Sequence, residues 1–261
     1  MKSSLSKIVI DSLDRIGIKA VAKWRWEKKE IASHTRNLLQ LLEVDCVLDV
    51  GANKGQYANF LRAHVGYEGE ILSFEPVPEL ALVLSERAKK DPLWHVFPCA
   101  LGAREGSLPI NVTQGTTLNS FLTPVRSGVE YIDQINTVVR TEEVPVRTVD
   151  SVLQERESSR SNTFFLKLDT QGYDHEVLKG TTNYLPHIAA LQMEISCLPI
   201  YEKMADFLES LESLKKLGFD VTGLFPVNRD KWLRVIEFDC LAVNKRWSEV
   251  GDISFMGTPL G

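Results

Sequence analysis

Two acidic residues directly follow short apolar segments that are typical of buried strands. Glu75 comes after residues 70–74, and Asp169 comes after residues 164–168. In an open α/β sheet, ligands bind in the crevice outside the carboxyl ends of the strands. We therefore expect both carboxylates to face one crevice, where they could bind hydroxyl groups or accept a proton.

A glycine-containing turn precedes these acids in the chain. The segment 48–57 reads Leu-Asp-Val-Gly-Ala-Asn-Lys-Gly-Gln-Tyr, so Gly51 and Gly55 separate an apolar strand from a predicted helix. Glycine lets the backbone approach a ligand closely, and the free N–H groups at a helix start favour a carboxylate. Asp49, inside the strand, could hold an amino group of the ligand or brace the turn.

The spacing favours a nucleoside ligand over a dinucleotide or a nucleoside triphosphate. Gln56 stands where the dinucleotide motif requires its third glycine, and no Lys-Ser/Thr pair follows Gly55. Glu75 lies 24 residues after Gly51, where an acid can accept both ribose hydroxyls. The small residues 99–102 after the third apolar segment could flank an adenine ring.

The elements that must position these residues alternate between strands and helices. We predict strands at 46–50, 70–74, 94–97, 164–168, 189–193, 219–224 and 235–243, and helices at 5–24, 28–42, 56–64, 79–90, 174–179 and 202–217. This alternation predicts a mainly parallel sheet covered on both faces. Only about ten residues join the last two strands, too few for a parallel crossover, so the final strand should be antiparallel.

One segment interrupts the alternation. Residues 103–162 contain two short predicted strands, 108–112 and 144–148, with a polar loop between them. Long ordered insertions in compact domains usually serve binding. We therefore expect Phe121, Tyr131 and the loop to form a lid or a wall for the substrate.

The charge distribution argues against non-specific nucleic-acid binding, because the chain carries a formal net charge of -5. Residues 1–40 are nevertheless basic, with nine Lys/Arg and four Asp/Glu. This segment either forms a solvated helix face or makes a weak contact with an anionic membrane or a phosphorylated substrate. Trp24 and Trp26 within it either pack on the core or contact a lipid-linked acceptor.

The cysteine pattern indicates a reducing compartment. Cys46, Cys99, Cys197 and Cys240 show no metal-ligand spacing and lie in or beside apolar segments, which is typical of buried thiols. The first residues lack the apolar core of a signal peptide, and no uncharged apolar stretch reaches the roughly 18 residues of a membrane span. We expect a cytoplasmic protein. The oligomeric state stays open and is compatible with a homodimer.

Several segments together resemble the FkbM family of S-adenosylmethionine-dependent methyltransferases. They are LDVGANKGQY (48–57), FEPVPE (74–79), ALG (100–102), TLNSFL (117–122) and KLDTQGYDHEVLKG (167–180). The resemblance implies a class I methyltransferase fold, an α/β Rossmann-like sheet of seven strands with an antiparallel last strand. It also implies S-adenosyl-L-methionine as cofactor and O-methylation of a sugar, glycolipid or polyketide-type hydroxyl.

The resemblance also suggests site residues. The expected cofactor-binding residues are Asp49, Gly51, Ala52, Asn53, Gly55, Tyr57, Glu75, Pro76, Ala100, Leu101 and Asp169, and the expected substrate-binding residues are Thr117, Asn119, Ser120, Gln171 and Tyr173. Two positions depart from the family pattern. Many members carry Glu where this chain has Gln171, and an apolar residue is common where it has His175.

Methyl transfer to a hydroxyl needs alignment and a group that accepts a proton. Asp169 is the first candidate for this base, with capping of the next helix as the alternative. Glu194, after the fifth strand, is the second candidate, with a solvent-facing charge as the alternative. His175 is the third, with a plain surface position as the alternative. Lys167 should pair with a carboxylate or meet an anionic substrate.

Alternatives from other functional classes are an NAD-dependent oxidoreductase, a cofactor-binding module without turnover, and an RNA 2′-O-methyltransferase. Asp169 and Glu194 could share a divalent metal ion, but the sequence has no dense cluster of ligands, so we predict no metal. For domain organisation we expect a helical extension at 1–43, a methyltransferase domain at 44–246 with 103–162 as a substrate lid, and a tail at 247–261.

Overall fold

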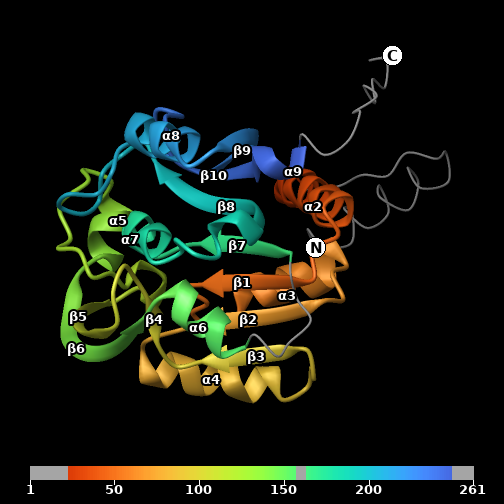
Figure 1. The fold of residues 1–261 in the computed structure, drawn as a ribbon. Coiled ribbons are helices and arrows are strands. Elements are labelled where there is room, and N and C mark those ends of the chain that lie inside the picture. The colour runs from red at the N-terminus through yellow and green to blue at the C-terminus, as the bar shows by residue number, and fades with distance from the viewer. Residues whose placement is uncertain (1–22, 157–162, 249–261) are drawn as a thin grey trace, which may run out of the picture.

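The computed structural model describes residues 23–156 and 163–248 (Figure 1). The described part excludes most of the helix predicted at 5–24. It also excludes the side chains of Trp24 and Trp26. Within it, no helix is long and apolar enough to span a bilayer.

A seven-stranded sheet forms the centre of the molecule, in the order β3-β2-β1-β7-β8-β10-β9. The strands are β1 (Cys46–Val50), β2 (Glu70–Phe74), β3 (Trp94–Phe97), β7 (Phe164–Leu168), β8 (Ile188–Ser196), β9 (Phe219–Arg229) and β10 (Val235–Asn244). The pairs from β3 to β8 are parallel, whereas β10 pairs antiparallel with both β8 and β9. The predicted fold class and the antiparallel last strand are confirmed.

Helices cover both faces of this sheet (Figure 1). They are α2 (Lys23–Leu41), α3 (Gln56–Phe60), the π-helical turn η1 (Leu61–Val65), α4 (Pro78–Ala88), α6 (Val149–Glu155), α7 (Asp174–Lys179), α8 (Phe207–Lys216) and α9 (Lys245–Ser248). Alternate residues of β1 point to opposite faces. Leu48 belongs to one buried core with residues of α6, α7 and α8, and Val47 belongs to the other with residues of α2, α3 and α4.

Helix α8 begins later than the sequence pattern predicts. The expected start was residue 202, but Asp206 caps the helix by accepting a hydrogen bond from the Glu209 backbone N–H at 2.9 Å. The Glu209 side chain in turn accepts from the Asp206 N–H at 3.0 Å. This reciprocal capping box fixes the helix start, so the prediction for 202–206 was wrong.

A second, three-stranded sheet lies beside the carboxyl ends of the central strands (Figure 1). It contains β4 (Ala100–Leu101), β5 (Gly106–Thr113) and β6 (Val138–Arg147), in the order β4-β6-β5. The short helices η2 (Thr116–Leu118) and α5 (Glu130–Ile135) lie between β5 and β6 in the chain, and η3 (Leu185–His187) precedes β8. Both β5 and β6 are longer than predicted. The inserted segment therefore contains more sheet than the sequence pattern predicts.

Candidate active site

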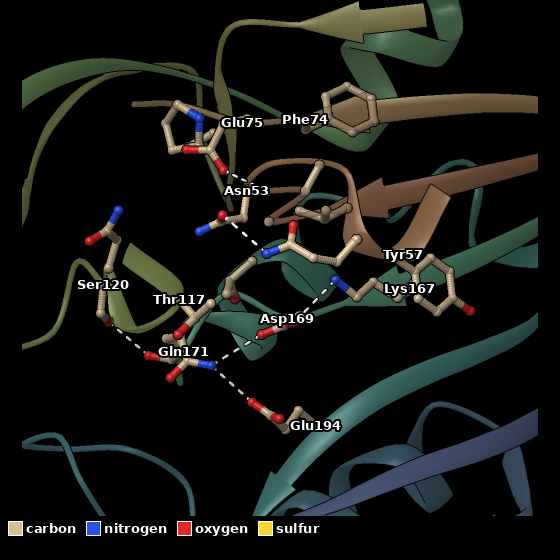
Figure 2. Close-up of a pocket in the computed structure, with 18 of the residues that line it drawn as sticks. Asn53, Tyr57, Phe74, Glu75, Thr117, Ser120, Lys167, Asp169, Gln171 and Glu194 are labelled. Carbon is tan, nitrogen blue, oxygen red and sulfur yellow. Dashed lines mark hydrogen bonds and ion pairs between the residues drawn. The ribbon is translucent and has the colours of Figure 1, made fainter. Parts of the chain in front are cut away.

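The structure places one cavity of about 380 Å³ at the carboxyl ends of the central strands (Figure 2). Most of the predicted site residues line it, namely Gly51, Ala52, Asn53, Tyr57, Glu75, Pro76, Ala100, Leu101, Thr117, Asn119, Ser120, Asp169, Gln171 and Glu194. Four other predicted residues do not line it, namely Asp49, Gly55, Tyr173 and His175. The sequence therefore located the cavity, while the ligand roles of its residues stay predictions.

Gly51, the first glycine of the turn, allows the ends of β1 and β7 to approach each other closely. Gly51 has a φ of 79°, and a Cβ atom there would lie 2.0 Å from the Asp169 carbonyl oxygen. The Gly51 and Ala52 N–H groups donate to the Phe74 carbonyl oxygen at 3.1 and 3.0 Å. Only glycine fits this approach, because an L side chain is strained at this φ and has no space.

Gly55, the second glycine of the turn, lies outside the cavity at the start of α3. Gly55 has a φ of 82° and precedes α3, and a Cβ atom there would lie 2.7 Å from the Trp94 ring. It does not line the cavity. Gly55 therefore serves the packing of α3 on Trp94.

Glu75 forms a fixed acidic wall of the cavity. Its side chain is buried, and Oε2 accepts a hydrogen bond from the Asn53 N–H at 2.7 Å while Oε1 accepts from the Val77 N–H at 2.9 Å. Burial raises the pKa of Glu75 to about 7, although both hydrogen bonds favour the charged form. The carboxylate is thus held in one orientation at the end of β2.

The inserted segment closes over the glycine turn. The Asn53 side-chain amide donates to the Thr116 carbonyl oxygen at 2.7 Å, which ties the turn to η2. Nearby, Asn119 Oδ1 accepts from the Thr113 N–H at 2.9 Å. The Asn119 Nδ2 group is buried and has no hydrogen-bond partner among the described residues. The Asn119 side chain is therefore held by its oxygen, while its buried amide nitrogen is left without a partner within the part of the chain that the structure describes.

Lys167 links two of the predicted acids beneath the cavity. Its Nζ lies 3.3 Å from Asp49 Oδ1 and 3.2 Å from Asp169 Oδ2, and 5.2 Å from the centroid of the Tyr57 ring. Burial alone would lower the pKa of Lys167, but the charges of Asp169 and Asp49 outweigh it and raise the pKa. Of the two alternatives for Lys167, the structure shows pairing with carboxylates.

Asp49 lies behind the cavity wall. It is fully buried and accepts a hydrogen bond from the Ser73 hydroxyl at 3.0 Å, in addition to its ion pair with Lys167. Burial raises the pKa of Asp49, and Lys167 opposes this effect. Of the two expectations for Asp49, this position fits a brace for the turn and for Lys167.

Gln171 joins the two leading candidates for the base. Its Nε2 donates to Asp169 Oδ1 at 3.1 Å and to Glu194 Oε2 at 2.9 Å (Figure 2). Its Oε1 accepts from the Tyr201 hydroxyl at 3.1 Å, and its backbone oxygen accepts from the Ser120 hydroxyl at 2.7 Å. The family departure at this position therefore places a neutral bridge between two carboxylates.

Asp169 does not cap the following helix. Helix α7 begins at Asp174 after Tyr173, and no side chain caps it. The Asp169 side chain instead contacts Lys167 and Gln171, and about a third of it, 37%, is exposed. Its carboxylate is therefore held by neighbours on one side and open to the cavity on the other.

Two polar residues of the cavity, Gln192 and Asp239, were not predicted from the sequence. Tyr57 donates its hydroxyl hydrogen to Gln192 Oε1 at 2.8 Å, and Gln192 Nε2 donates to Asp239 Oδ1 at 2.9 Å. Gln192 and Asp239 both line the cavity. Burial raises the pKa of Asp239 to about 6. Gln192 stands two residues before Glu194 on one strand, so the period-2 alternation could have identified it.

Glu194 lies among other acids. Burial raises the pKa of Glu194 well above its ordinary value, and the nearby charges of Asp169, Glu237 and Asp239 raise it further. Strand β10 brings Asp239 opposite Glu194. Two carboxylates that line the cavity, those of Glu194 and Asp239, therefore have raised pKa values.

The other aromatic and imidazole candidates lie outside the cavity. His175 Nε2 lies 3.4 Å from the Ser210 hydroxyl on α8. The Tyr173 ring packs 4.8 Å from the ring of Phe121, which does line the cavity. Tyr131 is exposed on α5. Tyr173 thus supports the cavity wall through Phe121, whereas His175 contacts the neighbouring helix.

Comparison with known protein families identifies a methyltransferase domain. Residues 49–221 match the family model of the methyltransferase FkbM domain, which covers more than half of the chain. The chain therefore belongs to the FkbM methyltransferase family. This assignment confirms the resemblance drawn from the motifs and supports S-adenosylmethionine as the cofactor.

Solved structures show similar folds at low identity. Methyltransferase FkbM from Methylobacillus flagellatus KT is 17% identical, with 77% of this chain and 43% of that chain covered and a TM-score of 0.48. Aeropyrum pernix fibrillarin in complex with S-adenosyl-L-methionine is 12% identical, with 82% and 74% covered and a TM-score of 0.44.

Magnesium protoporphyrin IX methyltransferase from Synechocystis PCC 6803 with bound SAM is 10% identical, with 91% and 96% covered and a TM-score of 0.44. This chain spans less than half the length of the Methylobacillus protein. No curated protein sequence matches this chain.

Proposed function

We propose that this protein is an S-adenosylmethionine-dependent O-methyltransferase that acts on a hydroxyl of a sugar, glycolipid or polyketide-type molecule. The observation that carries the proposal is the composition of the cavity. One wall holds the glycine turn and Glu75, and a neighbouring wall holds Asp169 and Glu194, bridged by Gln171. The first wall suits a nucleoside, and the second suits a hydroxyl group that must lose a proton.

The first wall fits the cofactor's nucleoside. Each oxygen of Glu75 accepts one backbone hydrogen bond and keeps acceptor capacity for a ribose hydroxyl. The apolar side chains of Phe74, Ala100 and Leu101 line the cavity next to it, where an adenine ring can pack. When bound, S-adenosylmethionine supplies a methyl group already activated by the positive charge on sulfur.

The second wall provides carboxylates that can bind the acceptor hydroxyl and take its proton. Asp169 and Glu194 can hold an acceptor hydroxyl by hydrogen bonds and take its proton as the oxygen becomes nucleophilic. Their common partner Gln171 fixes both carboxylates, which reduces the cost of aligning the reactants. The hydrogen bond from the Asn53 side chain to the Thr116 carbonyl oxygen holds η2 against the glycine turn.

We predict that Glu75→Ala weakens binding of S-adenosylhomocysteine by about tenfold to a hundredfold, because two charge-assisted hydrogen bonds to the ribose are lost. Isothermal titration calorimetry measures this change, with Glu86→Ala on the surface of α4 as the control. In the unaltered protein, affinity should fall as the pH drops through about 7, because protonated Glu75 accepts ribose hydroxyls less well. An unchanged affinity in Glu75→Ala would remove Glu75 from the cofactor site.

We predict that the rate of methyl transfer rises with pH along a limb controlled by Glu194. Burial and the neighbouring acids raise the pKa of Glu194, so protonation blocks the base at pH values where an ordinary glutamate is already charged. In Glu194→Gln the rate should fall and this limb should disappear, because Gln can still accept from Gln171 but takes no proton. Rate–pH profiles measure this, with Glu86→Gln as the control. An unaltered limb in Glu194→Gln would assign it to another group.

Ligand screens separate the proposal from the other functional classes. S-adenosylhomocysteine should raise the melting temperature, and NAD should not. Transfer of a labelled methyl group from S-adenosylmethionine should then be measured against sugars, glycolipids and polyketide alcohols, with RNA included. Stabilisation by NAD alone would support an oxidoreductase, transfer only to RNA would indicate a nucleic-acid substrate, and binding without transfer to any acceptor would indicate a module without turnover.

A further inference from the structure

The turn between β9 and β10 presents two large apolar side chains to solvent. Trp232 is 72% exposed and Leu233 is 74% exposed. Cationic residues flank them at Arg229, Lys231 and Arg234. Because apolar side chains stabilise a fold mainly when they are buried, this exposed pair adds little to stability and is available for binding.

The turn itself does not require a leucine. Leu233 has a φ of 64°, in the left-handed region that favours glycine or asparagine. Asp230 holds the turn, because its Oδ1 accepts from the Trp232 and Arg234 N–H groups at 2.8 and 3.0 Å. The Asp230 carbonyl oxygen also accepts from the Leu233 N–H at 3.0 Å. The sequence thus keeps a bulky apolar residue where backbone geometry disfavours it, which points to a role outside the fold.

The charge around the turn is opposite to that of the whole protein. Residues 229–234 contain three cations and one acid, a net of +2, whereas the chain carries -5. The Lys231 ammonium lies 5.5 Å from the centroid of the Trp232 ring. Aromatic rings combined with Lys and Arg are the side chains that favour the interface between membrane and water, and anionic lipids attract the cations.

The turn projects from the same edge of the sheet as the cavity. Strand β10 pairs Asp239 with Glu194 and Glu237 with Ser196, the last residue of β8. Arg229 pairs with Val235, so the turn extends beyond the end of β8. Val227 on β9 and Asp239 on β10 both line the cavity. The hairpin therefore connects the cavity wall directly to the exposed tip.

We propose that the 229–234 turn docks on an anionic lipid bilayer, with Trp232 and Leu233 inserted among the headgroups and the cations at the lipid phosphates. The tip is too small for a stable protein interface, which buries roughly 800 Å² on each partner. A bilayer needs only a few inserted side chains. Docking by this tip turns the cavity edge of the sheet toward the membrane. The proposal goes beyond methyl transfer and does not depend on it.

Sedimentation with lipid vesicles tests the docking on the full chain. The unaltered protein should bind vesicles of equal parts phosphatidylcholine and phosphatidylglycerol and should bind pure phosphatidylcholine much less. Trp232→Ser and Leu233→Asn should each lower the partition coefficient about tenfold. Leu82→Ser is the matched control, because Leu82 on α4 is similarly exposed at 68%, and it should leave binding unchanged.

Leu233→Asn also separates docking from folding. Asparagine suits the φ of 64°, so this variant should melt no lower than the unaltered protein while it loses vesicle binding. Vesicle binding that is absent, or that persists in both tip variants, would overturn the proposal. So would a concentration-dependent dimer that Leu233→Asn abolishes, because the tip would then serve a second copy of the chain. These readouts contain no methyl transfer, so a failed proposal for catalysis leaves them interpretable.

Discussion

Asp169→Asn should slow methyl transfer by about 10²- to 10⁴-fold, the usual contribution of a positioned acid–base group. The variant keeps the size of the side chain but removes its charge and its capacity to take a proton. It should therefore affect turnover far more than cofactor binding. Single-turnover rates with labelled S-adenosylmethionine and calorimetry with S-adenosylhomocysteine measure the two effects separately.

The contacts of Asp169 explain why asparagine cannot substitute. One oxygen lies 3.2 Å from the Lys167 ammonium, and the other accepts from Gln171 Nε2 at 3.1 Å. An amide at residue 169 would turn its NH₂ group toward one of these donors. Gln171 cannot reverse its own amide without losing its bonds to Glu194 and Tyr201. The loss of charge is therefore accompanied by a lost hydrogen bond.

Asp220→Asn provides the matched control for this variant. Asp220 is on β9, is largely exposed and pairs with Lys245, so its amide variant should leave turnover unchanged. If Asp169→Asn turns over at the unaltered rate with any acceptor, Asp169 neither takes the proton nor orients the hydroxyl. In that case Glu194, which we expect to control the rise of the rate with pH, is the remaining one of the two candidates for the base.

Gly51→Ala should cost about 2–5 kcal/mol of stability and abolish cofactor binding. The left-handed φ of 79° costs an L residue about 1–2 kcal/mol, and the new Cβ would lie 2.0 Å from the Asp169 carbonyl oxygen. Because that oxygen is backbone, β1 and β7 must move apart at the cavity. The displacement would reach Asp169 and the glycine turn together.

Gly66→Ala is the control that separates the two causes. Gly66 has a nearly equal φ of 75°, but nothing lies within 4 Å of a Cβ atom there. It should show the conformational cost alone and bind cofactor normally. Urea unfolding and calorimetry measure both quantities. Equal losses of stability in the two variants would mean that the close approach of β1 and β7 adds no cost.

The strand pattern could be predicted because each central strand is a short apolar segment that ends at a turn residue. The segment Cys46–Val50 is fully buried on both faces, which explains its continuous apolar character around Asp49. The antiparallel last strand followed from a chain-length argument, since residues 225–234 cannot make a crossover. These inferences use only local composition and distance along the chain.

The second sheet was harder to predict from the sequence, because its strands pair with partners that are distant in the chain. Strand β4 is two residues long, and its partners on β6, Val146 and Arg147, come more than forty residues later in the chain. Strand β5 is largely exposed over its first half and lacks a clear apolar alternation. Strand β6 is likewise exposed until residue 142. Only the partner strands define where these elements begin.

The candidate site was predictable at strand ends and less so elsewhere. Glu75 and Asp169 line the cavity because the carboxyl ends of parallel strands share one edge. Asp239 was missed because β10 runs in the opposite direction and enters the site from its first half. His175 lies outside the cavity because the first turn of α7 directs it toward α8, a packing contact that the sequence alone does not reveal.

The most direct measurement is a crystal structure of the protein with S-adenosylhomocysteine. We expect the ribose hydroxyls on the Glu75 carboxylate, the amino-acid end beside the turn that starts at Gly51, and the sulfur atom directed at Asp169 and Glu194. A ligand bound away from Glu75, or one with its sulfur on the far side of the cavity from Asp169, would contradict the account.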